Sequence, residues 1–137
     1  MRAEVVAMDG EHLNEEAIKK AGQILKDGGL VAFPTETVYG LGGNALDPRA
    51  SMKIYAAKGR PSDNPLIVHI AELEKLKEIT TKIPEGARIL AEKYWPGPLT
   101  MILPKADIVP KETTGGLDSV AVRFPSDVIA QELIRAA

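Results

Sequence analysis

Short apolar runs alternate with helical patterns along the whole chain, and this alternation restricts the possible folds more than any other feature. Strand-length runs rich in Val, Ile and Leu occupy residues 3–8, 30–35, 64–70, 98–104 and 119–124. Helical patterns occupy residues 15–27, about 48–57, 72–80, 84–93 and the segment from Asp127 onward. This order predicts an α/β fold in which helices pack on a sheet.

The spacing of the strand-like runs indicates how they pair. Residues 30–35 and the strand-like or looped segment 37–45 are too close for a crossover helix, so part of the sheet is expected to be antiparallel. We therefore predict a twisted, mixed sheet with parallel and antiparallel strands and flanking helices. The continuous apolar run at 30–35 also suits a strand that is covered on both faces.

Local signals predict where the helices begin and end. Asn14 is expected to cap the first helix, and Gly28-Gly29 to stop it. Asp47-Pro48 marks a second start, with a capping residue before a proline in the first turn. Ser126 is expected to cap the last helix. Residues 105–118 contain a proline and two glycines, and they are expected to form a mobile loop.

The composition excludes several classes of protein. A length of 137 residues predicts one domain, residues 1–137. The absence of cysteine excludes disulfides, thiolate chemistry and sulfur-bound zinc, and it suits a reducing compartment such as the cytoplasm. A formal net charge of −2 argues against a surface coated with basic charge for nucleic acid. The N-terminal residues lack the apolar core of a secretion signal, and no apolar run approaches the ~18 residues of a membrane span.

The densest basic stretch is Lys58-Gly59-Arg60, directly after a predicted helix, with Arg49 and Lys53 nearby. Two cations separated by one flexible residue can project together from a loop, where arginine grips phosphate oxygens bidentately and lysine acts as a point charge. The alternative is structural: Lys58 caps the end of a helix and Arg60 is solvated. Charge spacing alone favours the structural interpretation.

The glycine-rich segment Gly40–Ala45 has the spacing GxGxxA, but the next helix begins only at Asp47-Pro48. A dinucleotide-binding loop would begin its helix within the glycines, so the match is weak. These glycines are expected to allow a tight turn and close strand packing. The alternative is that small residues let a ligand approach the backbone.

Polar residues inside apolar segments are the remaining candidates. Thr35, Thr37 and Tyr39 alternate, which predicts three hydroxyls on one face of a strand, either lining a pocket or exposed. His69 is expected on the strand face opposite its apolar neighbours, where a structural role is more usual than catalysis. Arg123 shares a face with Ala121, and its charge reaches solvent unless that face lines a cleft.

Four strings carry a resemblance to a known family. The strings are FPTETVYGLGGNA, KGRPSDNPLIVHI, WPGPLTMIL and GGLDSVAVRFP. Their order and spacing resemble those of the YrdC-type threonylcarbamoyl-AMP synthase family. The resemblance extends over roughly residues 15–137. The resemblance implies a twisted α/β sheet curved around a basic cavity. It also implies a nucleotidyltransferase that makes threonylcarbamoyl-AMP and pyrophosphate from L-threonine, bicarbonate or carbon dioxide, and ATP. The product feeds the N6-threonylcarbamoyladenosine modification of tRNA.

The same resemblance implies roles for individual residues. Thr37 and His69 would contact the threonine and Arg123 would bind its carboxylate. Lys58 and Arg60 would lie nearest the ATP phosphates. The resemblance would also place Asn64 and Ser119 around ATP, with Thr35, Tyr39 and Thr100 lining the pocket. Magnesium is expected to accompany ATP, held mostly by phosphates and water, with no organic cofactor and no protein metal site.

Two alternatives remain open from the sequence. One is an RNA-binding module, which the acidic balance and the scarcity of aromatic residues weaken. The other is the carbamoyl-adenylate domain of hydrogenase-maturation proteins, although NPLIVHI resembles the threonine branch more closely. A tRNA or a downstream transferase complex is a possible partner, and a membrane is not expected.

The end of the sequence carries one further expectation. Domains of the family that the chain resembles continue to a Ser-x-Asn element that closes over the nucleotide. The sequence ends at QELIRAA, inside a predicted helix and with no stop signal after Arg135. We therefore expect a C-terminally truncated, YrdC-like domain that is poorly active alone.

Overall fold

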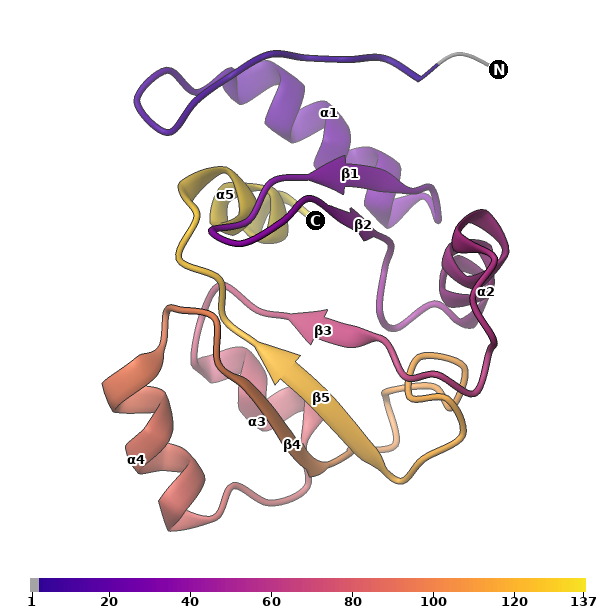
Figure 1. Cartoon of the computed structure of the whole chain (residues 1–137), viewed down its shortest axis with the longest axis vertical. Helices are drawn as coiled ribbons and strands as arrows, with labels where there is room; N and C mark the ends of the chain where they lie inside the picture. The colour runs from indigo at the N-terminus through magenta and orange to yellow at the C-terminus, as the bar shows by residue number, and fades with distance from the viewer. Residues whose placement is uncertain (1–2) are drawn as a thin grey trace.

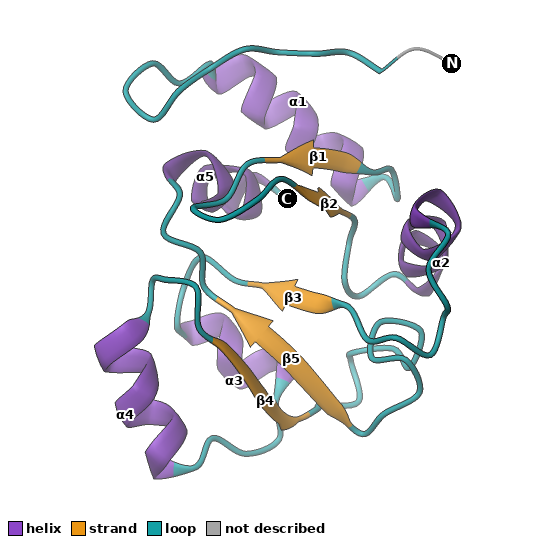
Figure 2. Cartoon of the chain, viewed as in Figure 1, coloured by secondary structure: helices purple, strands orange, loops and turns teal. Residues whose placement is uncertain are grey.

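A computed structural model describes residues 3–137 and shows helices packed on short strands (Figures 1 and 2). In chain order the elements are α1 (Glu15–Lys26), β1 (Val31–Phe33), β2 (Gly40–Gly42), α2 (Pro48–Lys58), β3 (Ile67–His69), α3 (Glu74–Ile79), α4 (Glu85–Tyr94), β4 (Thr100–Pro104), β5 (Ser119–Arg123) and α5 (Val128–Ala136). The predicted α/β class is confirmed. No helix within residues 3–137 is long and apolar enough to cross a membrane.

The strands form two ladders that together contain both strand directions. β1 and β2 pair antiparallel, as the short connection between them predicts. The second ladder has the order β3-β5-β4, in which β3 runs parallel to β5 and β4 runs antiparallel to it. The mixed sheet is therefore confirmed. Figure 1 shows β1 and β2 beside α1 and α5, and the three-stranded ladder beside α3 and α4.

The larger core lies under one face of the three-stranded ladder. Val120 and Val122 of β5 are completely buried, and they face the same way because side chains alternate along a strand. They pack in one cluster with Leu76 of α3 and Ala91 of α4, together with Trp95. This burial fixes the orientation of β5, so Ala121 and Arg123 lie on its other face, as the alternation predicts.

A smaller core holds α1, α5 and β1 together. Leu25 of α1, Phe33 of β1, and Ala130 and Leu133 of α5 form this cluster. The Phe33 ring also covers β2, where a Cβ added to Gly42 would lie 2.8 Å from the ring's Cε1. The predicted close packing at the glycines is therefore present, because a larger residue at Gly42 would collide with Phe33.

The capping signals of the first two helices are confirmed. The Asn14 side chain accepts a hydrogen bond from the Ala17 amide at the start of α1, and Gly28 ends the turn after α1 with a φ of 88°. The Asp47 side chain accepts from the Arg49 amide, and Pro48 is the first residue of α2. Both helices begin where a side-chain oxygen can satisfy a backbone amide that has no partner inside the helix.

Three expectations about the chain are wrong. Residues 3–8 form no strand, because no neighbouring strand pairs with them and Val5 is 89% exposed. The run at 30–35 is not covered on both faces, since Ala32 is exposed in a two-stranded ladder. The last helix is capped by Asp127, whose side chain accepts from the Ala130 amide, and not by Ser126.

Residues 105–118 form turns, as expected for a loop, but they are packed against the molecule. Thr113 and Thr114 are almost completely buried. The Thr113 hydroxyl donates to the Ala45 carbonyl at 2.6 Å and lies 2.7 Å from the Ser51 hydroxyl of α2. These buried polar contacts hold the loop in place, which does not agree with the expected mobile loop.

Candidate functional site

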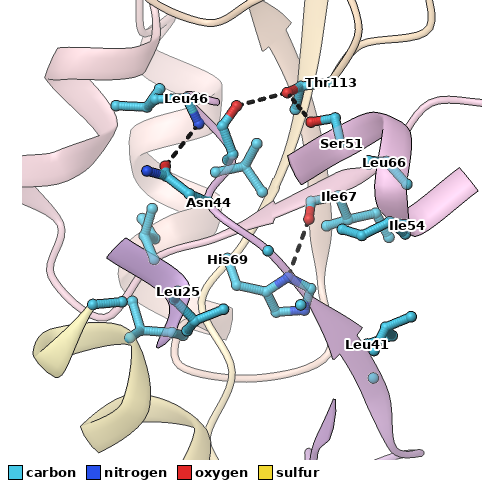
Figure 3. Close-up of a pocket in the computed structure, with 18 of the residues that line it drawn as sticks. Leu25, Leu41, Asn44, Leu46, Ser51, Ile54, Leu66, Ile67, His69 and Thr113 are labelled. Carbon is cyan, nitrogen blue, oxygen red and sulfur yellow. Dashed lines mark hydrogen bonds between the residues drawn. The ribbon is translucent and has the colours of Figure 1, made fainter. Parts of the chain in front are cut away.

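A pocket of about 600 Å³ separates the two ladders. The segment Gly40–Leu46 lines one side of it, and Leu66–Ile70 lines the other. Figure 3 shows side chains from both segments, together with Leu25 of α1 and Ile54 of α2. Cavities of this size, largely apolar with a few polar groups, are typical small-molecule sites.

Two cations predicted to act together do line this pocket. Lys58 is the last residue of α2, and Gly59 follows it with a left-handed φ of 61°. The Arg60 amide then donates to the Tyr55 carbonyl at 3.0 Å, which closes the helix end and turns the chain. Glycine adopts this conformation without strain, and it brings Lys58 and Arg60 to one cavity.

Arg60 is half-buried, so the interpretation of a solvated arginine is wrong. Its Nη2 donates to the Pro65 carbonyl at 2.9 Å, which fixes the guanidinium against the segment that leads into β3. Its Nε is buried without a hydrogen-bond partner among the residues that the structure describes. A buried donor of this kind favours an acceptor ligand, because an unsatisfied polar group is costly.

His69 lies on the same pocket from the end of β3. Its ring packs edge-on against Phe33, with ring centres 5.8 Å apart, and its Nδ1 lies 3.2 Å from the Ile67 carbonyl oxygen. Burial lowers the pKa of His69, and the bond to the Ile67 carbonyl opposes this in part. Because a carbonyl only accepts, Nδ1 carries the proton of the neutral ring and Nε2 remains an acceptor.

Three of the predicted residues form a row across the three-stranded ladder. His69 pairs with Arg123 in the parallel register, and Thr100 pairs with Arg123 in the antiparallel register. Paired residues on neighbouring strands point to the same face of a sheet. His69, Arg123 and Thr100 therefore share the face opposite the core.

Arg123 does not reach solvent. It is 8% exposed, and burial lowers the pKa of its guanidinium. Its Nη2 forms an ion pair with the Glu36 carboxylate, and its Nε donates to the Gly97 carbonyl at 3.4 Å. The backbone amide and the hydroxyl of Ser126 donate to the other oxygen of the same carboxylate. Arg123 thus faces an anion, the protein's own Glu36, and it does not line the pocket.

The predicted row of hydroxyls along a strand is wrong. Residues 34–39 form a turn, in which the Thr35 hydroxyl donates to the Val38 carbonyl at 2.6 Å and lies 3.1 Å from the Thr37 hydroxyl. Hydrogen bonds of this local kind compete with strand pairing. Tyr39 is 79% exposed, and none of Thr35, Thr37 and Tyr39 lines the pocket.

The remaining predicted residues lie apart from the pocket. Asn64 is exposed in the turn after Arg60 and does not line it. Ser119 is on the same face of β5 as Arg123 but at the opposite end of the strand, about 13 Å away at the usual rise per residue. The structure therefore brings together Lys58, Arg60 and His69, and separately His69, Arg123 and Thr100. The roles predicted for all these residues stay predictions.

Glu36 and Ser126 are site residues that the sequence did not reveal. They are 90 positions apart and meet only in the folded chain. The sole local signal was an acidic residue between two threonines in a segment with few charges. Within residues 3–137, no group of three or more histidine, aspartate or glutamate side chains is arranged to hold a metal ion.

Comparison with known proteins gives a consistent set of relatives. A family model for Sua5, YciO and YrdC proteins, described as telomere recombination, matches residues 23–137. A threonylcarbamoyl-AMP synthase of Pyrococcus abyssi is 56% identical over 90% of this chain, and one of Bacillus subtilis is 52% identical over 89%. The crystal structure of P. abyssi Sua5 complexed with L-threonine superimposes with a TM-score of 0.90 at 55% identity, over 91% of this chain.

The chain spans only part of each relative. It covers 36% of the length of the P. abyssi synthase and 36% of the B. subtilis synthase. It covers 37% of the chain in the L-threonine complex.

Proposed function

The chain belongs to the Sua5, YciO and YrdC family, and on that premise we propose that it acts in forming threonylcarbamoyl-AMP and pyrophosphate from L-threonine, bicarbonate or carbon dioxide, and ATP. The product would serve the N6-threonylcarbamoyladenosine modification of tRNA. Relatives named threonylcarbamoyl-AMP synthase, and one relative complexed with L-threonine, support this proposal.

One observation carries the proposal for this chain. Lys58 and Arg60 lie on the same pocket of about 600 Å³ as His69, although the first two come from the end of α2 and the third from β3. A triphosphate needs fixed cations, and a nucleoside needs apolar walls. The pocket offers both, with Lys58 and Arg60 for the phosphates and leucine and isoleucine side chains for the nucleoside.

The reaction needs no nucleophile from the protein. The threonine amine adds to carbon dioxide and loses a proton, which gives a carbamate. A carbamate oxygen then attacks the α-phosphorus of ATP, the bond from that phosphorus to the bridging oxygen breaks, and pyrophosphate leaves. The task of the protein is to hold two anions together and to stabilise the charge that develops at phosphorus.

The residues divide this task as follows in our proposal. Lys58 and Arg60 hold the phosphates, and Arg123 binds the threonine carboxylate. Neutral His69 offers Nε2 as an acceptor to the threonine hydroxyl or amine, and Thr37 contributes its hydroxyl. Mg²⁺ would arrive with ATP and offset phosphate charge, with oxygens of phosphate and water as its main ligands, because residues 3–137 offer no acidic cage.

Pyrophosphate release tests the proposal directly. Purified chain is incubated with ATP and Mg²⁺, with and without L-threonine and bicarbonate, and threonylcarbamoyl-AMP is identified by mass spectrometry. We expect pyrophosphate only when threonine and bicarbonate are both present. Calorimetry measures the binding of ATP and of L-threonine to the same chain separately. Pyrophosphate release that does not depend on threonine would contradict the proposal. A chain that binds neither ATP nor threonine would also contradict it.

A further inference from the structure

Three polar groups converge on the carboxylate of Glu36, one through an ion pair and two through hydrogen bonds. One oxygen faces Nη2 of Arg123, and the other accepts from the amide and the hydroxyl of Ser126. The Arg123 and Glu36 side chains are 10% and 21% exposed, whereas Ser126 lies at the surface. A guanidinium, a backbone amide and a hydroxyl around one anion form a complete carboxylate-binding group, which we call the carboxylate cradle (Arg123 and Ser126).

The cradle itself is fixed by its surroundings. Arg123 ends the central strand of the three-stranded ladder, and its Nε is held by the Gly97 carbonyl. Ser126 directly precedes the cap of α5, and the Gln131 side chain of that helix donates to the Pro125 carbonyl at 2.9 Å. Both residues of the cradle are therefore attached to packed elements.

The present occupant of the cradle comes from a different kind of segment. Glu36 lies in the turn between β1 and β2, where Val38 is 72% exposed and Tyr39 is 79% exposed. Exposed turns of this kind open at low free energy compared with packed elements. The carboxylate can leave the cradle more easily than the cradle can change shape.

We propose that Glu36 stands in for the substrate carboxylate, and that the amino acid binds by displacing Glu36 from the cradle of Arg123 and Ser126. The identity of the amino acid as threonine rests on the proposed function, whereas the cradle rests on its own geometry. Ser126 becomes a substrate-binding residue. Two carboxylates cannot share the cradle, because two like charges at this distance repel.

Displacement also links binding to the turn that carries Thr37. When Glu36 leaves, the turn loses its anchor on β5 and α5, and Thr37 next to it is free to move. Amino-acid binding would thus release Thr37 toward the site where the family resemblance places it. While Glu36 occupies the cradle, it lowers the apparent affinity for the amino acid. Removing the Glu36 carboxylate should therefore raise that affinity.

Calorimetry with Glu36→Gln tests the displacement. The amide fits the space of the carboxylate but loses its charge, so we expect the dissociation constant for L-threonine to fall by roughly tenfold. Adding Ser126→Ala to Glu36→Gln should weaken binding again several-fold. L-threoninol, which has no carboxylate, should gain nothing from Glu36→Gln. Glu92→Gln, at an exposed position on α4, is the matched control and should leave L-threonine binding unchanged.

Nuclear magnetic resonance of the unmodified chain gives a second, variant-free measurement. Saturation with L-threonine should shift the Ser126 amide signal and move the Glu36 carboxyl carbon toward its value in free glutamate. Equal or weaker L-threonine binding in Glu36→Gln, with an unmoved Ser126 signal, would overturn the cradle while leaving the proposed function intact. If L-threonine does not bind but acetate shifts Ser126 in Glu36→Gln, the cradle stands and the proposed substrate is wrong.

Discussion

The surroundings of each charged residue, more than its charge, decide what it can do in this protein. Lys58 is exposed at the end of a helix, whereas Arg60 two positions later is fixed against the Pro65 carbonyl and retains a buried Nε without a partner. Arg123 is enclosed and already paired with a carboxylate. Arg60 therefore has a donor without a partner, while Arg123 would have to give up Glu36 to bind another anion.

Lys58→Ala should weaken ATP binding and reduce any pyrophosphate release by about a hundredfold, because one fixed cation at a phosphate is lost. The free energy of unfolding of this variant should change little, since Lys58 is exposed. Arg49→Ala is the control: Arg49 is on the same helix, but it does not line the pocket and its side chain is 88% exposed. Calorimetry of ATP binding and thermal melting measure the two effects. Unchanged ATP affinity in Lys58→Ala would remove it from the phosphate site.

His69 should make the stability of the chain depend on pH. Its pKa is lowered in the folded protein, so below the ordinary value of 6.5 the unfolded chain takes up a proton that the folded chain resists. The contribution to stability is complete above pH 6.5 and decreases as pH falls from 6.5 toward the lower folded-state pKa. Urea denaturation between about pH 5 and about pH 8 should show this decrease. His69→Gln should remove it, and an unchanged pH profile in that variant would contradict the assignment.

At the scale of elements, buried side-chain hydrogen bonds connect segments that make no strand pairs. Thr113, in the loop before β5, bonds to the Ala45 carbonyl after β2 and to the Ser51 hydroxyl of α2. The amide of Leu66, ahead of β3, donates to the Thr113 carbonyl at 3.0 Å. One residue thus links three segments that line the pocket.

Thr113→Val keeps the shape of the side chain and removes its hydroxyl. The Ala45 carbonyl and the Ser51 hydroxyl then lose a buried partner, so we expect the free energy of unfolding to fall by about 1–3 kcal/mol. Thr81→Val, at an exposed position, is the control and should change it by less than about 0.5 kcal/mol. Equilibrium urea denaturation measures both variants. A loss in Thr113→Val no larger than in the control would show that these hydrogen bonds do not stabilise the fold.

At the scale of the whole molecule, two unequal cores lie on either side of the pocket. The larger contains Val120 and Val122 and unites the three-stranded ladder with α3 and α4. The smaller unites α1, α5 and β1 through Leu25, Phe33 and a few neighbours. Within the described residues no hydrogen-bonded strand joins the two ladders. The pocket therefore lies between two units, one built on each core.

Hydrogen exchange should distinguish these two units. Amides of β5 should exchange at the slowest rate, because Val120 and Val122 are completely buried in the larger core. Amides of β1 and β2 should exchange about tenfold faster or more, since local opening costs least where few apolar contacts are lost. Mass spectrometry of exchanged peptides measures both regions in one experiment. Equal protection in β1 and β5 would show that the molecule opens as a single unit.

The local elements of this fold could be predicted from the sequence because their causes lie within a few residues. Asn14 and Gly28 bound α1, Asp47-Pro48 begins α2, and alternation places Val120 and Val122 opposite Arg123. Each of these depends on hydrogen bonds or side-chain periods that span less than two turns. The shared position of Lys58 and Arg60 was predicted in the same way, because one glycine separates them.

Tertiary structure alone decided which distant segments meet. The extended run at 3–8 lacks a partner strand, and the hydroxyls from Thr35 to Tyr39 form a turn, so neither became the strand that its pattern favoured. Asp127 and not Ser126 caps the last helix, and the Ser126 amide and hydroxyl bond to Glu36 instead. That contact, like the ion pair of Glu36 with Arg123, joins residues about ninety positions apart. No local pattern encodes such a pairing, since it arises only when the packed cores bring the β1–β2 turn against the end of β5.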